Sequence, residues 1–343
     1  MKDIKSLNLE ELKEEMVGNQ EKEFRAKQVY EWLHVKIVSD FSEMLNLPKS
    51  LRDKLSHVFF CPVLKAVNVQ ESMMDGTKKY LFELNDGNVI ESVLMKYKHG
   101  NSVCISSQVG CKMGCTFCAS TIDGLARSLS PSEMLEQIYA ITRLQGERIS
   151  NVVVMGSGEP LDNYENLLKF IELISDENGL NISQRNITVS TCGIVPKIYE
   201  LADQKLQITL AISLHASNNE KRKMLMPIAK KYGMDELLEA CVYYFEQTKR
   251  RISFEYSLVA GVNDSTEEAD ELSKKIRHMN CHVNLIPVNP IVERDYANPD
   301  KKAIHAFKNK LEKNGINVTI RREMGQDIDG ACGQLRRRHM NEI

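Results

Sequence analysis

The stretch Cys104-Ile-Ser-Ser-Gln-Val-Gly-Cys111-Lys-Met-Gly-Cys115-Thr-Phe-Cys118 decides how the rest of the chain is interpreted. It holds four of the nine cysteines of the chain, and three of them have the spacing Cys-x3-Cys-x2-Cys among glycines. Thiolates on such a loop can converge on one inorganic centre. Iron–sulfur clusters are usually held by four thiolates, so three local thiolates predict a four-iron cluster with one iron open to a substrate or cofactor.

Two simpler interpretations compete with a cluster at this loop. A structural zinc site is normally closed by four ligands and favours paired Cys-x2-Cys hooks, so a zinc knuckle here would have to borrow a distant fourth ligand. Alternatively, the thiols are buried and only pack. Cysteines rarely crowd by chance onto one glycine-rich loop, and the iron–sulfur interpretation is therefore favoured.

The composition indicates a globular protein with reduced thiols. The chain has 343 residues and is 42% hydrophobic, enough for one large domain and a small one. Its net charge of −2 gives no global sign of a nucleic-acid partner, so any basic surface must be local. An odd number of cysteines argues against a disulfide-stapled secreted protein. Because the chain also lacks an apolar signal core and a run of ~20 apolar residues, we expect a cytoplasmic protein without a membrane partner.

Residues 1–60 predict a helical accessory domain. Apolar residues recur at helical spacing in three places. We expect a first helix that opens at Asn8 or Glu10, a longer one from Phe24 through Ile37, and a third that starts at Pro48.

Residues 61–100 predict a β-hairpin linking region. Apolar and polar residues alternate over 63–71, 78–84 and 89–97, and Asp75-Gly76 and Asn85-Asp86-Gly87 between them are hairpin turn signals. Glu91 lies in the third expected strand, where a glutamate is by default exposed.

Residues 101–343 predict an α/β core in which strands and helices alternate. Such βα units form a parallel sheet with right-handed crossovers. No Gly-x-Gly-x-x-Gly follows the first strand, which favours a barrel-like sheet over a dinucleotide-binding fold. We expect strands at 103–106, 151–155, 186–190, 207–213, 253–258, 282–287 and 317–321, and helices at 131–144, 165–175, 196–203, 234–247, 266–279 and 301–314.

Polar motifs follow several of these strands, at the barrel end where reactive residues gather. In Gly156-Ser-Gly158-Glu159-Pro160, glycines allow a ligand to approach the backbone and Glu159 can accept from an ammonium group, although a plain βα turn has the same composition. His215, in Ser213-Leu214-His215, is equally well an ordinary histidine of the barrel mouth. The remaining cysteines outside the loop and the C-terminal segment are expected to be packing thiols: Cys61, Cys192, Cys241 and Cys281.

A second cysteine motif lies near the C-terminus. The segment reads Arg321-Arg322-Glu-Met-Gly-Gln-Asp327-Ile-Asp329-Gly-Ala-Cys332-Gly-Gln-Leu, and Arg336-Arg337-Arg338 follows it. Alone, Cys332 would be an inert buried thiol. The arginines are either a solvated helix end or a local contact for phosphate.

The cysteine loop resembles that of radical S-adenosylmethionine (SAM) enzymes. Residues 102–120, together with Asp-Ile-Asp-x-Ala-Cys-Gly-Gln-Leu, are similar to the RlmN/Cfr family of RNA methyltransferases, and the similarity extends over nearly the whole chain. It implies a partial (β/α)6 barrel, an RNA-binding role for the N-terminal domain, and two cofactors, a [4Fe-4S] cluster and SAM. Cys111, Cys115 and Cys118 match the cluster ligands. The positions that match the SAM pocket are Gly158, Glu159, Ser190, Ser213, Leu214, His215 and Asn289.

The resemblance also implies a reaction. One SAM methylates Cys332, and a second yields a 5′-deoxyadenosyl radical that takes hydrogen from this methyl group. The resulting methylene radical adds to adenine. Cys104 then assists proton removal or resolves the protein–RNA bond, which leaves a Cys104–Cys332 disulfide. Glu91 matches a family glutamate proposed as a proton acceptor, and the residues alone do not divide that role between Glu91 and Cys104.

The implied substrate is carbon 2 of an adenosine in 23S rRNA near the peptidyl-transferase centre, as in RlmN-type members, some of which also act on tRNA anticodon loops. Lys96 is closer to the Cfr type, which methylates carbon 8. Two other classes stay open: a radical SAM enzyme with a non-RNA substrate, and a non-enzymatic iron–sulfur or zinc protein that binds RNA. The expected partners are the RNA and a one-electron donor such as flavodoxin or ferredoxin.

Overall fold

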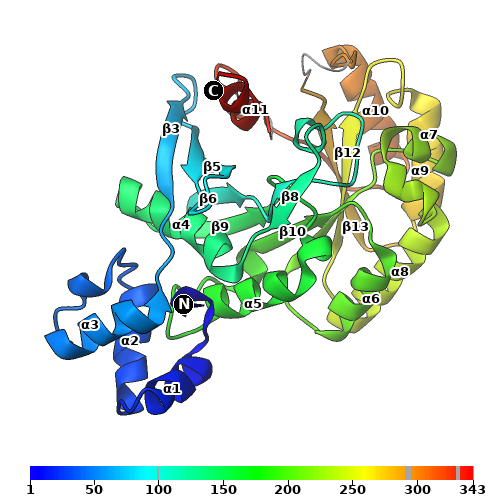
Figure 1. Cartoon of the computed structure of the whole chain (residues 1–343). Helices are drawn as coiled ribbons and strands as arrows, with labels where there is room; N and C mark the ends of the chain where they lie inside the picture. Colours follow the sequence, from blue (N-terminus) through cyan, green and yellow to red (C-terminus); the bar gives the residue numbers. More distant parts are fainter. Residues whose placement is uncertain (99, 290–294, 330–332, 343) are drawn as a thin grey trace.

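A ten-stranded mixed sheet forms the centre of the molecule (Figure 1). The computed structural model describes residues 1–98, 100–289, 295–329 and 333–342. Along the sheet the strand order is β14-β13-β12-β11-β10-β9-β6-β5-β4-β3, and neighbours from β6 to β14 are parallel. The parallel strands are β6 (Gly100–Ile105), β9 (Ile149–Val154), β10 (Ile187–Thr191), β11 (Thr209–Ser213), β12 (Ile252–Leu258), β13 (Cys281–Pro287) and β14 (Val318–Ile320).

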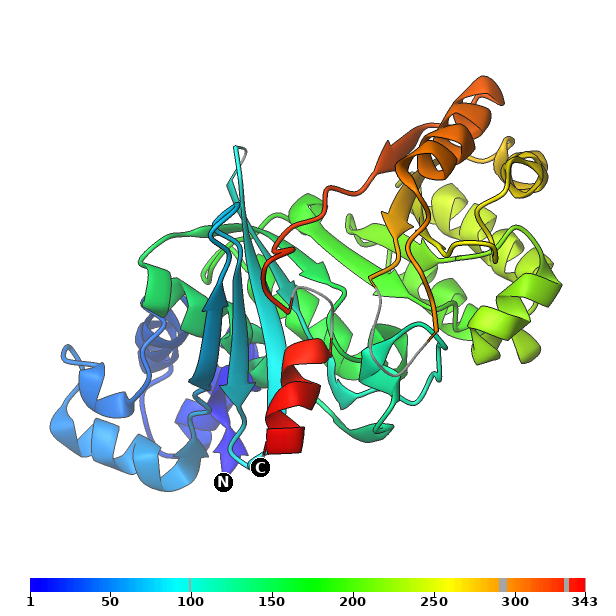
Figure 2. The same cartoon turned by 90° about the horizontal axis from the view of Figure 1, so that it is seen from above.

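Helices connect the parallel strands and cover the outer face of the sheet (Figures 1 and 2). Local signals set their ends: Ser130 and Glu133 form a capping box at the start of the first helix, and Gly146 ends it with a φ of 66°. The α/β class and the incomplete parallel barrel are thus confirmed. The connecting helices are α4 (Pro131–Gln145), α5 (Tyr164–Ser175), α6 (Val195–Asp203), α7 (Asn219–Leu225), α8 (Met234–Thr248), α9 (Thr266–Ile276) and α10 (Lys301–Lys313).

The expected linking strands extend this same sheet. β5 (Val89–Tyr97) pairs antiparallel with β6, with Val93 opposite Cys104, and β4 (Lys78–Glu83) and β3 (Lys65–Glu71) follow. Main-chain pairing therefore crosses the boundary between residues 61–100 and 101–343, and the division into domains stays a prediction. A small hairpin that the sequence analysis did not predict, β7 (Gln108–Gly110) with β8 (Leu125–Ser128), flanks the cysteine loop.

Three helices form the N-terminal part: α1 (Leu9–Gly18), α2 (Phe24–His34) and α3 (Lys49–Val58). The expectation that the second helix runs through Ile37 is wrong, because the chain leaves the helix at Val35 and Ile37 has a φ of 50°. Ile37 is nevertheless buried, which explains its place in the apolar pattern. No helix among the described residues is both long and apolar enough to cross a membrane.

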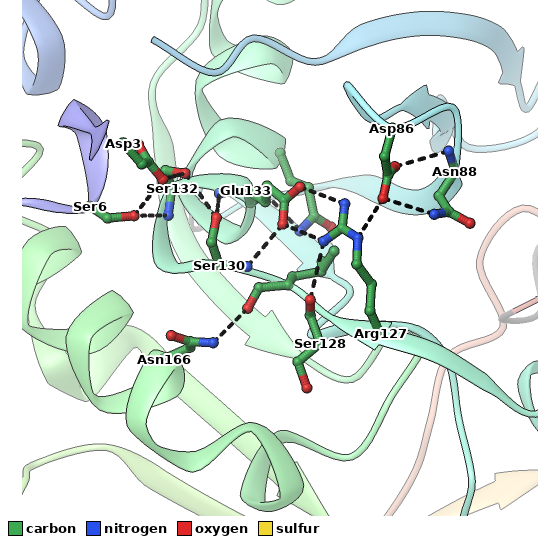
Figure 3. Close-up of polar contacts among 12 residues, drawn as sticks. Asp3, Ser6, Asp86, Asn88, Arg127, Ser128, Ser130, Ser132, Glu133 and Asn166 are labelled. Carbon is green, nitrogen blue, oxygen red and sulfur yellow. Dashed lines mark hydrogen bonds and ion pairs between the residues drawn. The ribbon is translucent and has the colours of Figure 1, made fainter. Parts of the chain in front are cut away.

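Buried polar contacts fasten the N-terminal part to the core. Lys5 and Glu136 of α4 are both fully buried, with Nζ and Oε1 2.5 Å apart, and Arg143 contacts the other oxygen of Glu136 at 2.7 Å. Next to them, Asp3 and Ser6 hydrogen-bond Ser132 (Figure 3).

Arg127 similarly links the hairpin strands to the core through ion pairs. Its guanidinium contacts Asp86 in the β4–β5 turn at 2.6 Å and Glu133 of α4 at 2.8 Å (Figure 3). The N-terminal helices, the hairpin strands and the barrel are thus joined through α4.

Candidate active site

A cavity of about 580 Å³ opens at the carboxyl ends of the parallel strands. Residues from the ends of β10, β11, β12 and β13 line it, together with the cysteine loop after β6 and residues 321–326 after β14. In parallel α/β barrels this end carries the reactive groups. The fold therefore brings segments more than 200 residues apart in sequence to one site.

The three cysteines predicted to bind the cluster lie on one wall of this cavity. Cys111 and Cys115 are buried, and Cys118 is half-buried. Main-chain hydrogen bonds hold the loop: Cys111 N–H donates to Gly124 O at 2.8 Å, and Thr121 Oγ1 donates to the carbonyls of Cys115 and Cys118 at 3.1 and 2.9 Å.

The donor set fits an iron–sulfur cluster. Burial raises the pKa of the Cys111 thiol to about 12 and also raises the pKa of Cys115, so both thiols keep their protons until a metal replaces them. Soft thiol ligands select iron–sulfur clusters, zinc or Cu(I). Among the residues that the structure describes, no three His, Cys, Asp or Glu side chains converge as ligands of a single metal ion.

The glycines of Gly156-Ser-Gly158 are required by close packing beside this loop. Gly158 has a φ of 105°, and a Cβ there would lie 2.6 Å from Cβ of Gln108. A Cβ at Gly156 would lie 2.7 Å from the carbonyl oxygen of Ile105. Ser157 donates from Oγ to Ser120 Oγ at 2.8 Å. The motif thus presents its backbone to the cavity in a shape that side chains would destroy.

Glu159 is a buried carboxylate in the cavity wall. Its two oxygens accept from the backbone N–H groups of Leu161 at 3.0 Å and Cys192 at 2.7 Å. Desolvation nevertheless raises its pKa. A carboxylate oxygen accepts more than one hydrogen bond, so Glu159 can still accept from an ammonium group.

Four of the other predicted SAM positions line the same cavity, namely Ser190, Ser213, His215 and Asn289. The Oγ atoms of Ser190 and Ser213 are 3.5 Å apart. Leu214 differs, because its side chain is fully buried in the core and does not line the cavity; its backbone N–H donates to Glu255 O at 3.0 Å.

His215 is held rigidly at the end of β11. It has a φ of 54°, its Nδ1 accepts from Ser257 N–H at 2.8 Å, and its ring meets Phe117 edge-on with centroids 4.8 Å apart. Burial lowers its pKa to about 3. With Nδ1 accepting, the neutral ring carries its proton on Nε2. Sequence reasoning missed both neighbours: Phe117 occupies a variable position of the cysteine motif, and Ser257 lies in β12 outside any recognisable motif.

Two of the predicted packing thiols differ in their position relative to the cavity. Cys192 packs with Cys115, Leu225 and Met226 as a buried apolar cluster, but it also lines the cavity. Cys281 is buried in β13 and does not line the cavity.

Cys104 lies in the cavity wall and is buried, whereas Cys332 is outside the described residues. Glu91 is 4% exposed, so the expectation of an exposed strand glutamate is wrong. Its carboxylate accepts from the backbone N–H groups of Gly333 and Arg336, both at 2.6 Å, and lies 3.1 Å from Nζ of Lys79. Burial of Glu91 thus results from contacts with the other end of the chain.

The segments on both sides of residues 330–332 are fastened to β3, β4 and β5. Helix α11 (Gln334–Glu342) starts at the amide groups that Glu91 holds, and Leu335 packs on Leu81 and Val89. In Figure 2 the C-terminal helix lies against the hairpin strands. On the N-terminal side of residue 330, Gly325 N–H donates to Asp75, and Asp327 accepts from Ser72 and Met73. Asp329 bonds with the Gln70 side chain, and its carbonyl accepts from Lys79 Nζ.

Comparisons with known proteins agree with this site. Residues 105–273 match the radical SAM superfamily, and residues 2–61 match the ribosomal RNA large subunit methyltransferase N-terminal domain. Proteins described as probable dual-specificity RNA methyltransferase RlmN are similar: that of Lachnospira eligens is 66% identical, covering 100% of this chain and 98% of its own length. That of Lachnoclostridium phytofermentans is 62% identical over 99% of this chain and 96% of its own.

A solved structure has the same fold. The crystal structure of a radical SAM methyltransferase from Sphaerobacter thermophilus superposes with a TM-score of 0.94 at 40% identity, covering 97% of this chain and 99% of that one. Together with the relatives and the cavity that unites the three cluster cysteines, this similarity identifies the chain as a member of the RlmN family of radical SAM RNA methyltransferases.

Proposed function

We propose that this protein methylates carbon 2 of adenosine in 23S rRNA near the peptidyl-transferase centre and in tRNA, with Cys332 as the residue that carries the methyl group. The observation that carries the proposal is the single cavity lined by the three cluster cysteines, the SAM-type motif at Gly158-Glu159, and Cys104. The dual-specificity relatives at 55–66% identity support both RNA substrates.

In the proposed active enzyme, Cys111, Cys115 and Cys118 hold the [4Fe-4S] cluster, and Gly158, Glu159, Ser190, Ser213, His215 and Asn289 surround SAM. The cofactors supply the electron and the methyl carbon that permit reaction at an unactivated aromatic carbon. Glu159 orients the amino group of SAM through its carboxylate. Leu214 contributes through its backbone only, because its side chain is in the core.

The chain's own thiols and Glu91 complete the proposed roles. Cys104 Sγ, in the cavity wall, accepts the adenine proton or resolves the covalent bond to Cys332 by forming a disulfide. Glu91 is predicted from the family as a proton acceptor. Its contacts directly support a second role, holding the segment that follows Cys332 against β5, because both carboxylate oxygens accept main-chain N–H groups of that segment.

RNA is proposed to approach over the arginines at the cavity rim. Arg321 and Arg322 are exposed and line the cavity, where they can contact phosphates without reading bases. The target adenine must leave its stack to reach the cavity floor, which favours a loop in structured RNA. Because SAM cleavage takes one electron, we also propose a donor such as flavodoxin or ferredoxin, and a cytoplasmic location.

The test uses anaerobic protein reconstituted with iron and sulfide, SAM, a reductant, and rRNA or tRNA that lacks the modification. We expect mass spectrometry of the product nucleosides to find 2-methyladenosine, lost in Cys332→Ala and in Cys104→Ala. Cys281→Ala, which removes a buried thiol outside the cavity, is the matched control and should keep activity.

Other products would contradict parts of the proposal. 8-Methyladenosine would assign the protein to the Cfr type. The structure offers no support for that type from Lys96, which pairs with Glu147 at 2.9 Å and does not line the cavity. 5′-Deoxyadenosine without any methyladenosine would support the proposed radical chemistry and contradict the proposed RNA substrate.

A further inference from the structure

Arg222 on α7 is a fully buried cation. Its Nη2 donates to the carbonyl oxygen of Cys192 at 2.7 Å and, more weakly, to that of Ser213 at 3.4 Å. Among the described residues, Nε and Nη1 find no hydrogen-bond partner, and no carboxylate forms an ion pair with Arg222. The guanidinium charge is thus uncompensated in the chain alone.

Such a charge is costly. An unpaired buried ion carries a desolvation penalty of several kcal/mol, and proteins normally offset it with a partner. Here the ionisable groups nearest Arg222 are the thiols of Cys192, Cys115 and Cys241. Among the described residues no carboxylate pairs with the guanidinium, so a negative group bound at the cysteine loop is the candidate partner.

Arg222 lies directly behind the cysteine loop. Helix α7 ends at Leu225, whose carbonyl oxygen accepts from the Thr116 N–H at 2.9 Å. Leu225 and Met226 pack with Cys115 and Cys192 in one apolar cluster, and Met226 lines the cavity. A cation embedded in apolar surroundings acts over several ångströms with little screening. The guanidinium therefore faces the cluster site through a low-dielectric wall.

We propose that Arg222 is the built-in counter-charge of the iron–sulfur cluster, which it stabilises and makes easier to reduce. The inference rests on the proposed cluster site. Three thiolates give a four-iron cluster a net negative charge, and one-electron reduction adds another. A fixed cation nearby favours the more negative form, and net charge around a cluster is one of the factors that set its reduction potential.

The first test compares Arg222→Met, Arg222→Lys and wild type after cluster loading, without RNA. A redox titration with dithionite and mediators, followed by electron paramagnetic resonance, gives the midpoint potential. For Arg222→Met we expect the ratio of reduced to oxidised cluster at a fixed potential to fall about tenfold, which is about 59 mV for a one-electron couple. Arg222→Lys keeps the charge and should stay close to wild type.

Arg250→Met is the matched control. Arg250 donates to Thr209 Oγ1 of β11 at 3.3 Å and to Ile208 O just before that strand at 3.4 Å, at the opposite end of β11 from Ser213. The Arg250→Met variant should leave the midpoint potential of the cluster unchanged. Equal potentials in Arg222→Met and wild type would overturn the inference. A wild-type protein that assembles no cluster would instead refute the proposed function itself.

The second test measures thermal unfolding with and without the cluster. Because Arg222→Met removes an uncompensated charge, the cluster-free variant should unfold at the same temperature as the cluster-free wild type or higher. Cluster loading should raise the unfolding temperature of the variant less than that of the wild type. A merely structural arginine would give the reverse, a cluster-free variant that is less stable or does not fold. That outcome would also overturn the inference.

Discussion

Replacing Glu91 by glutamine should loosen the C-terminal helix α11 while leaving the sheet folded. The Glu91 carboxylate accepts the Gly333 and Arg336 N–H groups and lies 3.1 Å from Lys79 Nζ. A carboxamide keeps one acceptor oxygen but turns an NH2 donor toward the second N–H. The variant therefore loses one of two short hydrogen bonds and the attraction to Lys79, without a change of shape.

The magnitude follows from burial and charge. A hydrogen bond to a charged group contributes about 1.5–3 kcal/mol, and an unsatisfied buried donor adds a desolvation penalty. Glu91 is only 4% exposed, so solvent screens it weakly. We expect the docking of α11 to weaken by about 3 kcal/mol, which is roughly 150-fold in the local opening equilibrium.

Hydrogen–deuterium exchange read by mass spectrometry tests this directly. Peptides over residues 333–342 should exchange faster in Glu91→Gln, while those over α10 stay as in the wild type. Glu71→Gln is the matched control, because it breaks the exposed Lys78–Glu71 pair on the same sheet, which contributes little. Unchanged exchange over 333–342, or equal acceleration in α10, would refute the anchoring role of Glu91.

Three further changes have defined outcomes. Gly158→Ala should abolish SAM binding to the cluster-loaded protein in calorimetry, because its Cβ would lie 2.6 Å from Cβ of Gln108 at a φ of 105°. His34 has its pKa lowered to about 3 by burial, so protonation favours the unfolded chain as pH falls from about 6.5 toward 3. In urea denaturation, lowering the pH from 7 to 4 should therefore reduce the unfolding free energy of His34→Gln by about 3 kcal/mol less than that of the wild type. Lys5→Met should lower the unfolding free energy by about 3 kcal/mol in the same assay, since it leaves Glu136 buried with one partner fewer.

The glycine and lysine changes each have a matched control. Gly124→Ala places its Cβ in open space at a comparable φ of 70° and should bind SAM normally. Lys2→Met removes the exposed Lys2–Glu15 pair and should change stability little. SAM binding by Gly158→Ala, parallel pH curves for His34→Gln, or a Lys5→Met protein as stable as its control would each contradict the reasoning behind it.

The repeating part of the fold could be predicted from sequence because its signals are local. Apolar periodicity and caps such as Ser130 involve residues only one or two helical turns apart, and they identify each βα unit. The polar motif of each unit then follows the end of its strand. The contacts of Glu91 could not be predicted in the same way. They depend on Gly333 and Arg336, 242 and 245 residues away, and strand periodicity contains no information about such a partner.

Arg222 was missed for a related reason. It lies in Asn-Glu-Lys-Arg-Lys, a run of charges typical of a solvated helix, and α7 is too short to show an apolar stripe. Only the packing of α7 against the cysteine loop buries Arg222 completely, while Lys221 stays partly exposed and Lys223 exposed. Burial of a single charge within a charged run is a tertiary property.

The C-terminal segment explains how an open sheet can enclose a reaction. The sheet ends in β14 on one side and β3 on the other, and these end strands are not neighbours in the strand order of the described residues. From β14 the chain runs back across the molecule to the hairpin strands (Figure 2). Residues of this path, Arg321 to Gln326, Ile328 and Gln334, line the cavity. The contacts at Asp327, Asp329 and Glu91 then fix it on β3–β5. Because the same segment lines the site and bears Cys332, the proposed methyl carrier, in its sequence, any change that loosens its docking should alter both cavity access and methyl transfer.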